Sequence, residues 1–268
     1  MAIISKHFTR GIIFFGGNHG ISMDIEIYEL GLIAIVTLCA SYIQSVTGFG
    51  FGIVAMIFLP IFLLYTEANV LSSILSTVTS ALLMITTYRK TNWKNLFFPL
   101  LGSSVANYLA ITFVKSAKNE TLTLLLGIAL FVLSIYFFFF SNKIKFRPSW
   151  YSGLIAGLIS GIMSGLFSIG GPPVVIYYMQ SEEDTDRYLA TISTYFVFSG
   201  IISISMKAIS GFITQNVLLG VAIGVLGMLI GSFFGKFTRG KANPKMIKKS
   251  VYGVMAFSGL ANIITSLI

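Results

Sequence analysis

Hydrophobic residues occur along this chain in long uninterrupted runs separated by short polar segments. The runs are too long for strands and do not alternate with a period of two. Because lipid offers the backbone no hydrogen-bond partners, we predict an all-α, polytopic membrane protein with about eight to ten hydrophobic segments. The ten runs lie at roughly 27–46, 52–65, 69–88, 95–114, 120–140, 150–167, 172–180, 188–206, 217–235 and 246–267.

Two of these segments, 52–65 and 172–180, are short, and each follows a glycine-rich break. The first break, at 44–52, is QSVTGFGFG, and the second, at 164–173, is SGLFSIGGPP. Glycine allows backbone conformations that other residues avoid, and proline ends one helix or begins the next. We therefore expect each break to contain a helix end, a short loop and a new helix start.

The composition agrees with a membrane protein, since 55% of the residues are apolar and only 10% are charged, against about 25% charged in soluble domains. The net charge of +9 would suit nucleic-acid binding in a soluble protein. Here the basic residues lie between apolar runs, so membrane topology explains them and we expect no nucleic-acid partner.

The distribution of lysine and arginine predicts the orientation in the membrane. If each broken pair enters and returns, thirteen of these residues fall on one side and five, including Lys207, on the other. The positive-inside rule makes the first side cytoplasmic and places both termini outside the cell membrane.

The same order of segments predicts two halves. Each half has a broken pair followed by three spans, and an odd number of segments inverts the second half relative to the first. An offset of 120 residues aligns Gly50 with Gly170 and Ser73 with Ser193. We expect an N-terminal extension at 1–24, a first transmembrane repeat at 25–141, a cytoplasmic linker at 142–149 and a second transmembrane repeat at 150–268.

The two breaks are the candidate binding site. A helix start carries unpaired N–H groups and a partial positive charge, which suit an anion, and nearby hydroxyls add donors. The alternative is that the glycines only allow close helix packing, which is our interpretation of the unbroken glycine series at 153–161 and 220–231. The predicted substrate-binding residues are Gln44, Ser45, Thr47, Gly48, Gly50, Gly52, Ser164, Ser168, Gly170 and Gly171.

Other polar residues are expected to have structural roles. Lys207 is predicted to lie near the outer end of its segment and to extend its amine towards the surface. The acidic stretch at 181–187 is interpreted as a solvated cytoplasmic loop, with a gate or cation-attracting vestibule as the alternative. Asn107 is expected to form a hydrogen bond between helices.

An enzyme is not expected. No histidine lies in a predicted span, the motifs HExxH and GxSxG are absent, and Cys39 is the only cysteine. We therefore predict no catalytic residue, no metal ligand and no cofactor.

The two breaks resemble those of the sulfite exporter TauE/SafE family of membrane permeases. The resemblance rests on GFGFG at 48–52 followed by LP at 59–60, and on SGLFSIGGPP at 164–173. It implies transport of a small anion, such as sulfite or an organosulfonate. Phe51 stands where many members have glycine, and Ser168, Pro172 and Pro173 interrupt an all-glycine run, so the backbone cradle is expected to differ in shape.

Together these features predict a secondary transporter that moves a small anion across the bilayer by alternating access. A passive anion channel that uses the same helix ends is the alternative. Either H⁺ or Na⁺ would serve as a coupling ion, and a homodimer is left open as the assembly.

Overall fold

The computed structural model describes residues 27–139, 147–182, 184–238 and 244–267, and these residues form helices and no strands. The first half contains α2 (Ile27–Thr47), α3 (Phe51–Phe58), α4 (Tyr65–Thr87), α5 (Trp93–Ser116) and α6 (Asn119–Phe139). The second half contains α7 (Trp150–Phe167), α8 (Gly171–Ser181), α9 (Thr185–Ile209), α10 (Gln215–Thr238) and α11 (Pro244–Leu267). Short 3₁₀ helices, η1 (Leu59–Ile61) and η2 (Tyr88–Lys90), follow α3 and α4.

The lengths of these helices confirm a polytopic membrane protein. Among the described residues, seven helices are long and apolar enough to cross a bilayer, namely α2, α4, α5, α6, α7, α9 and α10. Large apolar side chains cover their outer faces, and Phe97 and Phe237 are each 64% exposed. Such a surface suits lipid rather than water. As the runs predict, α3 and α8 are short.

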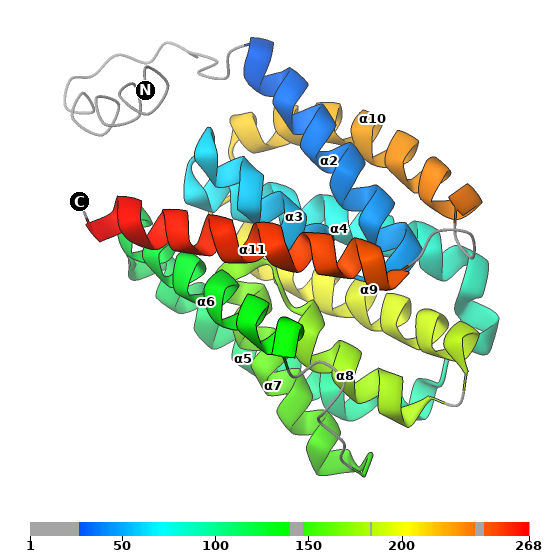
Figure 1. Cartoon of the computed structure of the whole chain (residues 1–268). Coiled ribbons are helices and arrows are strands. Elements are labelled where there is room, and N and C mark those ends of the chain that lie inside the picture. Colours follow the sequence, from blue (N-terminus) through cyan, green and yellow to red (C-terminus); the bar gives the residue numbers. More distant parts are fainter. Residues whose placement is uncertain (1–26, 140–146, 183, 239–243, 268) are drawn as a thin grey trace.

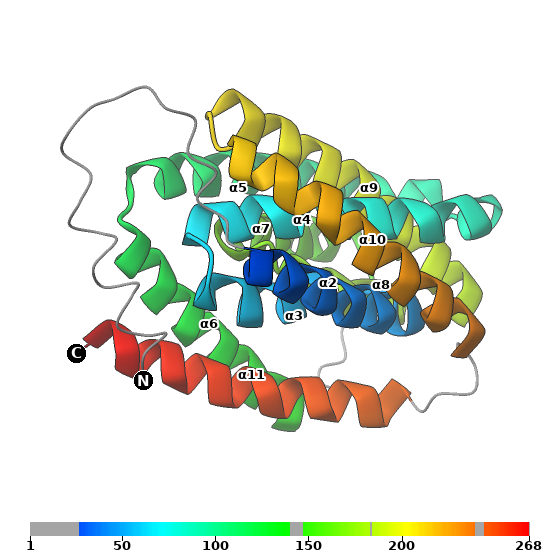
Figure 2. The same cartoon turned by 90° about the horizontal axis from the view of Figure 1, so that it is seen from above.

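The helices pair across the two halves (Figures 1 and 2). α5 packs against α7, α10 against α2, α4 against α9 and α6 against α11. If the helices of the two halves are matched in order, α2 corresponds to α7, α4 to α9, α5 to α10 and α6 to α11. The α5–α7 contact then corresponds to the α10–α2 contact, whereas α4–α9 and α6–α11 each correspond to themselves. The inversion of the second half relative to the membrane stays a prediction.

Glycine allows two of these pairs to approach closely, which confirms the packing interpretation of the unbroken series. A Cβ atom on Gly157 would lie 2.1 Å from the carbonyl oxygen of Pro99 in α5. A Cβ atom on Gly227 would lie 2.1 Å from the carbonyl oxygen of Ala34 in α2. Only glycine lets the backbones touch at these points.

The innermost pair, α4 and α9, is polar where the outer helices are apolar. Its buried polar side chains include Asn69, Ser73, Thr77, Ser80, Ser193, Ser199, Ser203 and Lys207. Polar groups buried at membrane depth require partners or a water-filled space. We therefore expect a polar site between α4 and α9, at the centre of the bundle. The predicted extension at 1–24 and residues 142–146 of the linker lie outside the described residues.

Candidate functional site

The two glycine-rich breaks meet at the centre of the bundle. In the first, the chain leaves α2 and enters α3 through Gly48 and Gly50, which have φ angles of 84° and 110°. In the second, Ser168 ends α7 with a φ of 56°. A Cβ atom on Gly52 would lie only 1.9 Å from the carbonyl oxygen of Ser168. The start of α3 therefore rests directly on the backbone of the second break.

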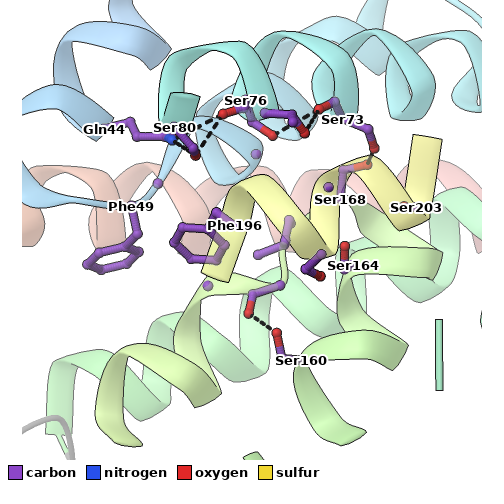
Figure 3. Close-up of a pocket in the computed structure, with 18 of the residues that line it drawn as sticks. Gln44, Phe49, Ser73, Ser76, Ser80, Ser160, Ser164, Ser168, Phe196 and Ser203 are labelled. Atoms are coloured by element: carbon purple, nitrogen blue, oxygen red, sulfur yellow. Dashed lines mark hydrogen bonds between the residues drawn. The ribbon is translucent and has the colours of Figure 1, made fainter. Parts of the chain in front are cut away.

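A cavity of about 60 Å³ lies between the two breaks, α4 and α9 (Figure 3). That volume holds a few water molecules, since one water needs roughly 10–15 Å³ measured this way. Seven of the ten predicted binding residues line it: Gln44, Gly50, Gly52, Ser164, Ser168, Gly170 and Gly171. The rest of the lining comes mainly from two helices that the motifs did not include, with Ser73, Ser76, Thr77 and Ser80 on α4 and Tyr195, Phe196, Ser199, Gly200 and Ser203 on α9.

The other three predicted residues shape the first break without lining the cavity. Ser45 packs against α10, where a Cβ atom on Gly235 would lie 2.6 Å from the Ser45 Cβ. The Thr47 hydroxyl lies 2.6 Å from the carbonyl oxygen of Phe49 and closes the loop. Gly48 faces α9, and a Cβ there would lie 2.8 Å from Leu189 Cδ2.

A periodic signal for the missed lining residues was present in the sequence. Positions 69, 73, 76, 77 and 80 lie on one face of α4, and positions 199, 203 and 207 lie on one face of α9, because three- and four-residue steps keep a helix face. Gln44, at the end of α2, connects the first break to this face of α4. Its Nε2 donates to the Ser80 hydroxyl at 2.7 Å and to the Ser76 carbonyl at 3.2 Å. Reading serine as well as apolar periodicity would have found both faces.

The start of α3 offers backbone donors to the cavity. The first intrahelical bond runs from the Val54 N–H to the Gly50 carbonyl at 3.1 Å. The N–H groups of Phe51, Gly52 and Ile53 precede it, so they have no intrahelical acceptor. No side chain in the described part of the protein caps this helix. A bare helix start of this kind favours an anion.

The start of α8 differs, because Pro172 and Pro173 have no N–H. Gly171 is therefore the one residue in its first turn that can donate an unpaired N–H. The start of α3 therefore has three unpaired N–H groups and the start of α8 has one, which agrees with the expectation that the prolines change the backbone cradle. Hydroxyls in and beside the second break remain. Ser168 donates to the Asn69 carbonyl on α4, and Ser160 of α7 donates to the Gly170 carbonyl and accepts from Tyr195 at 2.9 Å.

Lys207 lies inside the bundle, and the prediction that it extends towards the surface is wrong. Only 1% of its surface is exposed. Its Nζ donates to Asn69 Oδ1, to the Ser73 hydroxyl and to the Ser168 hydroxyl at 3.1 Å. An ammonium has three donors, and three oxygens from α4 and the second break accept them, so the side chain turns inward. With Lys207 removed from the outer side, the charge asymmetry on which the orientation rests becomes thirteen to four.

The acidic stretch is only partly solvated. Asp184 caps α9 by accepting from the Arg187 N–H, and Asp186 pairs with Lys90 on the surface. Glu182 is buried instead: its carboxylate accepts from Asn95 Nδ2 at 2.8 Å, accepts from Asn92, and lies 3.4 Å from Arg187. The interpretation as a solvated loop is therefore wrong for Glu182, which fastens the end of α8 to the start of α5.

Asn107 also departs from its predicted role. It is 1% exposed, and neither polar atom of its amide has a hydrogen-bond partner in the described part of the chain. It lies on α5 beside Gly165 of α7, where a Cβ atom on the glycine would lie 3.1 Å from the Asn107 carbonyl oxygen. The expectation of an interhelical hydrogen bond is wrong here.

The fold and the cavity define a class of protein. Broken helices that meet at a polar cavity inside a bundle of spanning helices are typical of secondary transporters. Residues 33–262 match the family of the sulfite exporter TauE/SafE, so the chain belongs to that family. It is a multi-pass membrane transporter of sulfite or related anions, and the family consists of permeases rather than enzymes. Comparisons with curated proteins and with solved structures found no match.

Proposed function

We propose that this protein carries sulfite or a small organosulfonate across the cell membrane by alternating access. The observation that carries the proposal is the cavity where the two breaks meet, because it combines the unpaired N–H groups at the start of α3 with the hydroxyls of α4, α7 and α9. Backbone N–H groups and hydroxyls that converge on one space can form charge-assisted hydrogen bonds to an anion bound there.

The two ends of the cavity suit the two parts of such a substrate. Phe49 and Phe196 lie at one end in Figure 3, and Ser73, Ser168 and Ser203 lie at the other. A sulfite or sulfonate oxygen would accept hydrogen bonds at the serine end. A short carbon group, where the substrate has one, would contact the aromatic rings.

The pairing of the helices supports alternating access. α4 and α9 carry the lining from opposite halves, and exchanging the halves converts the α5–α7 contact into the α10–α2 contact. Rocking one half against the other would expose the same cavity first to one side and then to the other. We include in this proposal an inverted second half, both termini outside, and coupling to H⁺ or Na⁺.

Transport by purified protein in liposomes tests the proposal. We expect uptake of labelled sulfite or thiosulfate to saturate with concentration and to accelerate when the liposomes are preloaded with unlabelled anion. Liposomes without protein are the control. Uptake that never saturates, with a measurable current and no exchange, would favour the passive channel. The absence of both binding and uptake for sulfite, thiosulfate and sulfonates would rule out the assignment.

A further inference from the structure

Lys207 lies directly behind the serine end of the cavity. It is separated from the cavity by two hydroxyls, those of Ser73 and Ser168, which line the cavity and accept from its Nζ. The two hydroxyls also lie 2.6 Å from each other. A hydroxyl that accepts a bond from an ammonium becomes a stronger donor through its own proton. Each hydroxyl has a single proton, and Ser168 uses its proton on the Asn69 backbone oxygen at 2.8 Å or on Ser73. The proton of Ser73 can turn to an anion in the cavity, and through it the charge of Lys207 can act on that anion.

The ammonium of Lys207 has no carboxylate partner among the residues that the structure describes. Its three acceptors are an amide oxygen and two hydroxyls, all neutral. The ion pairs found in the described residues join Lys90 to Asp186 and Arg187 to Glu182. Both pairs lie near the end of α4 and the start of α9, whereas Lys207 lies near the end of α9. A buried charge that is solvated but not neutralised is costly at membrane depth and marks a functional position.

Ser203 provides a second and independent sign of an occupant. It precedes Lys207 by four residues, so both side chains lie on the same face of α9. It is 1% exposed and lines the cavity. Its hydroxyl has no hydrogen-bond partner within the described part of the protein. A polar atom of this kind normally has a partner, and an anion in the cavity would supply one.

We propose that Lys207 supplies the positive charge of the anion site, acting through Ser73 and Ser168, and that this charge makes the site prefer dianions over monoanions. The inference deepens the proposed transport function and rests on it. Lys207 is a positioning residue in this scheme, since Ser73 and Ser203 donate to the substrate and Ser168 links Ser73 to the lysine. The favoured ligand is a small oxyanion with two negative charges, because attraction to a single cation grows with the charge of the ligand.

Binding to purified protein tests the charge role. Isothermal titration would measure the affinity for thiosulfate, a dianion, and for methanesulfonate, a monoanion. In Lys207→Met we expect thiosulfate affinity to fall by about tenfold or more, and the thiosulfate-to-methanesulfonate ratio to fall with it. Lys207→Arg keeps the charge and should restore most of that ratio. The matched control is Lys115→Met, which removes an exposed lysine from the end of α5 and should change neither affinity.

A second variant keeps the test decisive if Lys207→Met does not fold. Ser203→Asp places a carboxylate one helical turn from Lys207, where the ion pair would neutralise the site and help the chain to fold. We expect Ser203→Asp to lose the thiosulfate preference, whereas Ser116→Asp, which adds the same charge at the exposed end of α5, should keep it. Thiosulfate binding by Ser203→Asp at the wild-type level would overturn the inference.

The remaining outcomes separate the two proposals. If wild-type protein binds neither anion, the transport function fails and the role of Lys207 fails with it. If wild-type protein binds both anions and Lys207→Met keeps the same ratio, only the charge role fails. An equal loss for both anions, accompanied by a lower melting temperature, would show that Lys207 is a structural clamp between α9 and α4, and would also overturn the inference.

Discussion

The two breaks have similar backbones but different chemical surroundings. The first break packs against Leu189, Ile192 and the ring of Tyr188 on α9 and presents a bare helix start. The second break packs against Asn69 and Ser73 on α4 and presents hydroxyls backed by Lys207. Each break contacts the central helix of the opposite half.

The difference is also visible in single positions. An offset of 120 residues aligns Lys207 with Thr87 and Ser73 with Ser193. Thr87 and Ser193 contact each other through hydroxyls 3.5 Å apart, in the place where the second break has an ammonium. The second half therefore has a lysine at this position, whereas the first half has a neutral threonine. Four sets of variants test this division, and they follow in order of expected effect.

The contact between the breaks should be the most sensitive feature. In Gly52→Val, the Cβ atom would lie 1.9 Å from the Ser168 carbonyl oxygen. The backbone fixes the positions of both atoms, so no side-chain rotation can relieve the clash. We expect transport to fall to the level of empty liposomes, because the breaks can no longer meet. Gly31→Val is the matched control, since a Cβ at Gly31 has nothing within 4 Å. Normal uptake by Gly52→Val would contradict the meeting of the two breaks.

Bulky residues at the equivalent glycines of the two breaks should abolish transport while leaving membrane insertion intact. Gly50 has a φ of 110°, which L residues rarely adopt, and a Cβ on Gly170 would lie 2.9 Å from the Ser164 Cβ. Gly50→Leu and Gly170→Leu would both fill the cavity. Uptake into liposomes and the yield of protein in the membrane fraction measure the two effects separately. Undiminished uptake in both variants would remove the site from the breaks.

Ser168 separates the role of a hydroxyl from that of a backbone conformation. Ser168→Ala and Ser168→Gly both remove the hydroxyl that Lys207 contacts, so we expect equally weakened thiosulfate binding. Only glycine relieves the left-handed φ of 56°. We expect Ser168→Gly to be more stable than Ser168→Ala by about 1 kcal/mol. Thermal unfolding in detergent gives the comparison, and full binding by either variant would exclude a role for the hydroxyl.

The smallest effect is expected from making the second helix start resemble the first. Pro172→Ala with Pro173→Ala restores two N–H groups at the start of α8. We expect anion affinity to rise by about two- to fivefold, the equivalent of 0.3–1 kcal/mol for a charge at a helix start. Titration with thiosulfate measures the change, and Pro148→Ala, outside the breaks, is the control. Unchanged affinity would mean that the start of α8 does not face the anion.

Much of the fold could be predicted from local pattern. The length of the apolar runs determines which segments span the bilayer, and Gly48, Gly50, Pro172 and Pro173 mark where helices stop. These properties depend on neighbours in the chain, because lipid and backbone sterics act on each segment separately. The predicted helix boundaries therefore agree with the structure within a few residues, except that the segment predicted at 52–65 ends in the structure at Phe58 and α4 already begins at Tyr65.

The placement of Lys207 could not be predicted in the same way. At the end of an apolar run, a lysine can extend outward to water or inward to a polar partner, and local sequence permits both. Its direction depends on Asn69, Ser73 and Ser168, which lie far away in the chain. The lining of the cavity by α4 and α9 depends on the same long-range pairing.

By itself, the sequence determined the all-helical membrane fold, the number and place of its segments and the two breaks, because these follow from the hydrophobicity and backbone preferences of consecutive residues. Only the tertiary structure decided that the breaks touch, that serines of α4 and α9 complete the cavity, and that a lysine stands behind one end of it. Those features arise from packing between distant segments, where close backbone approach at glycine and hydrogen bonding to a buried charge select one arrangement from many.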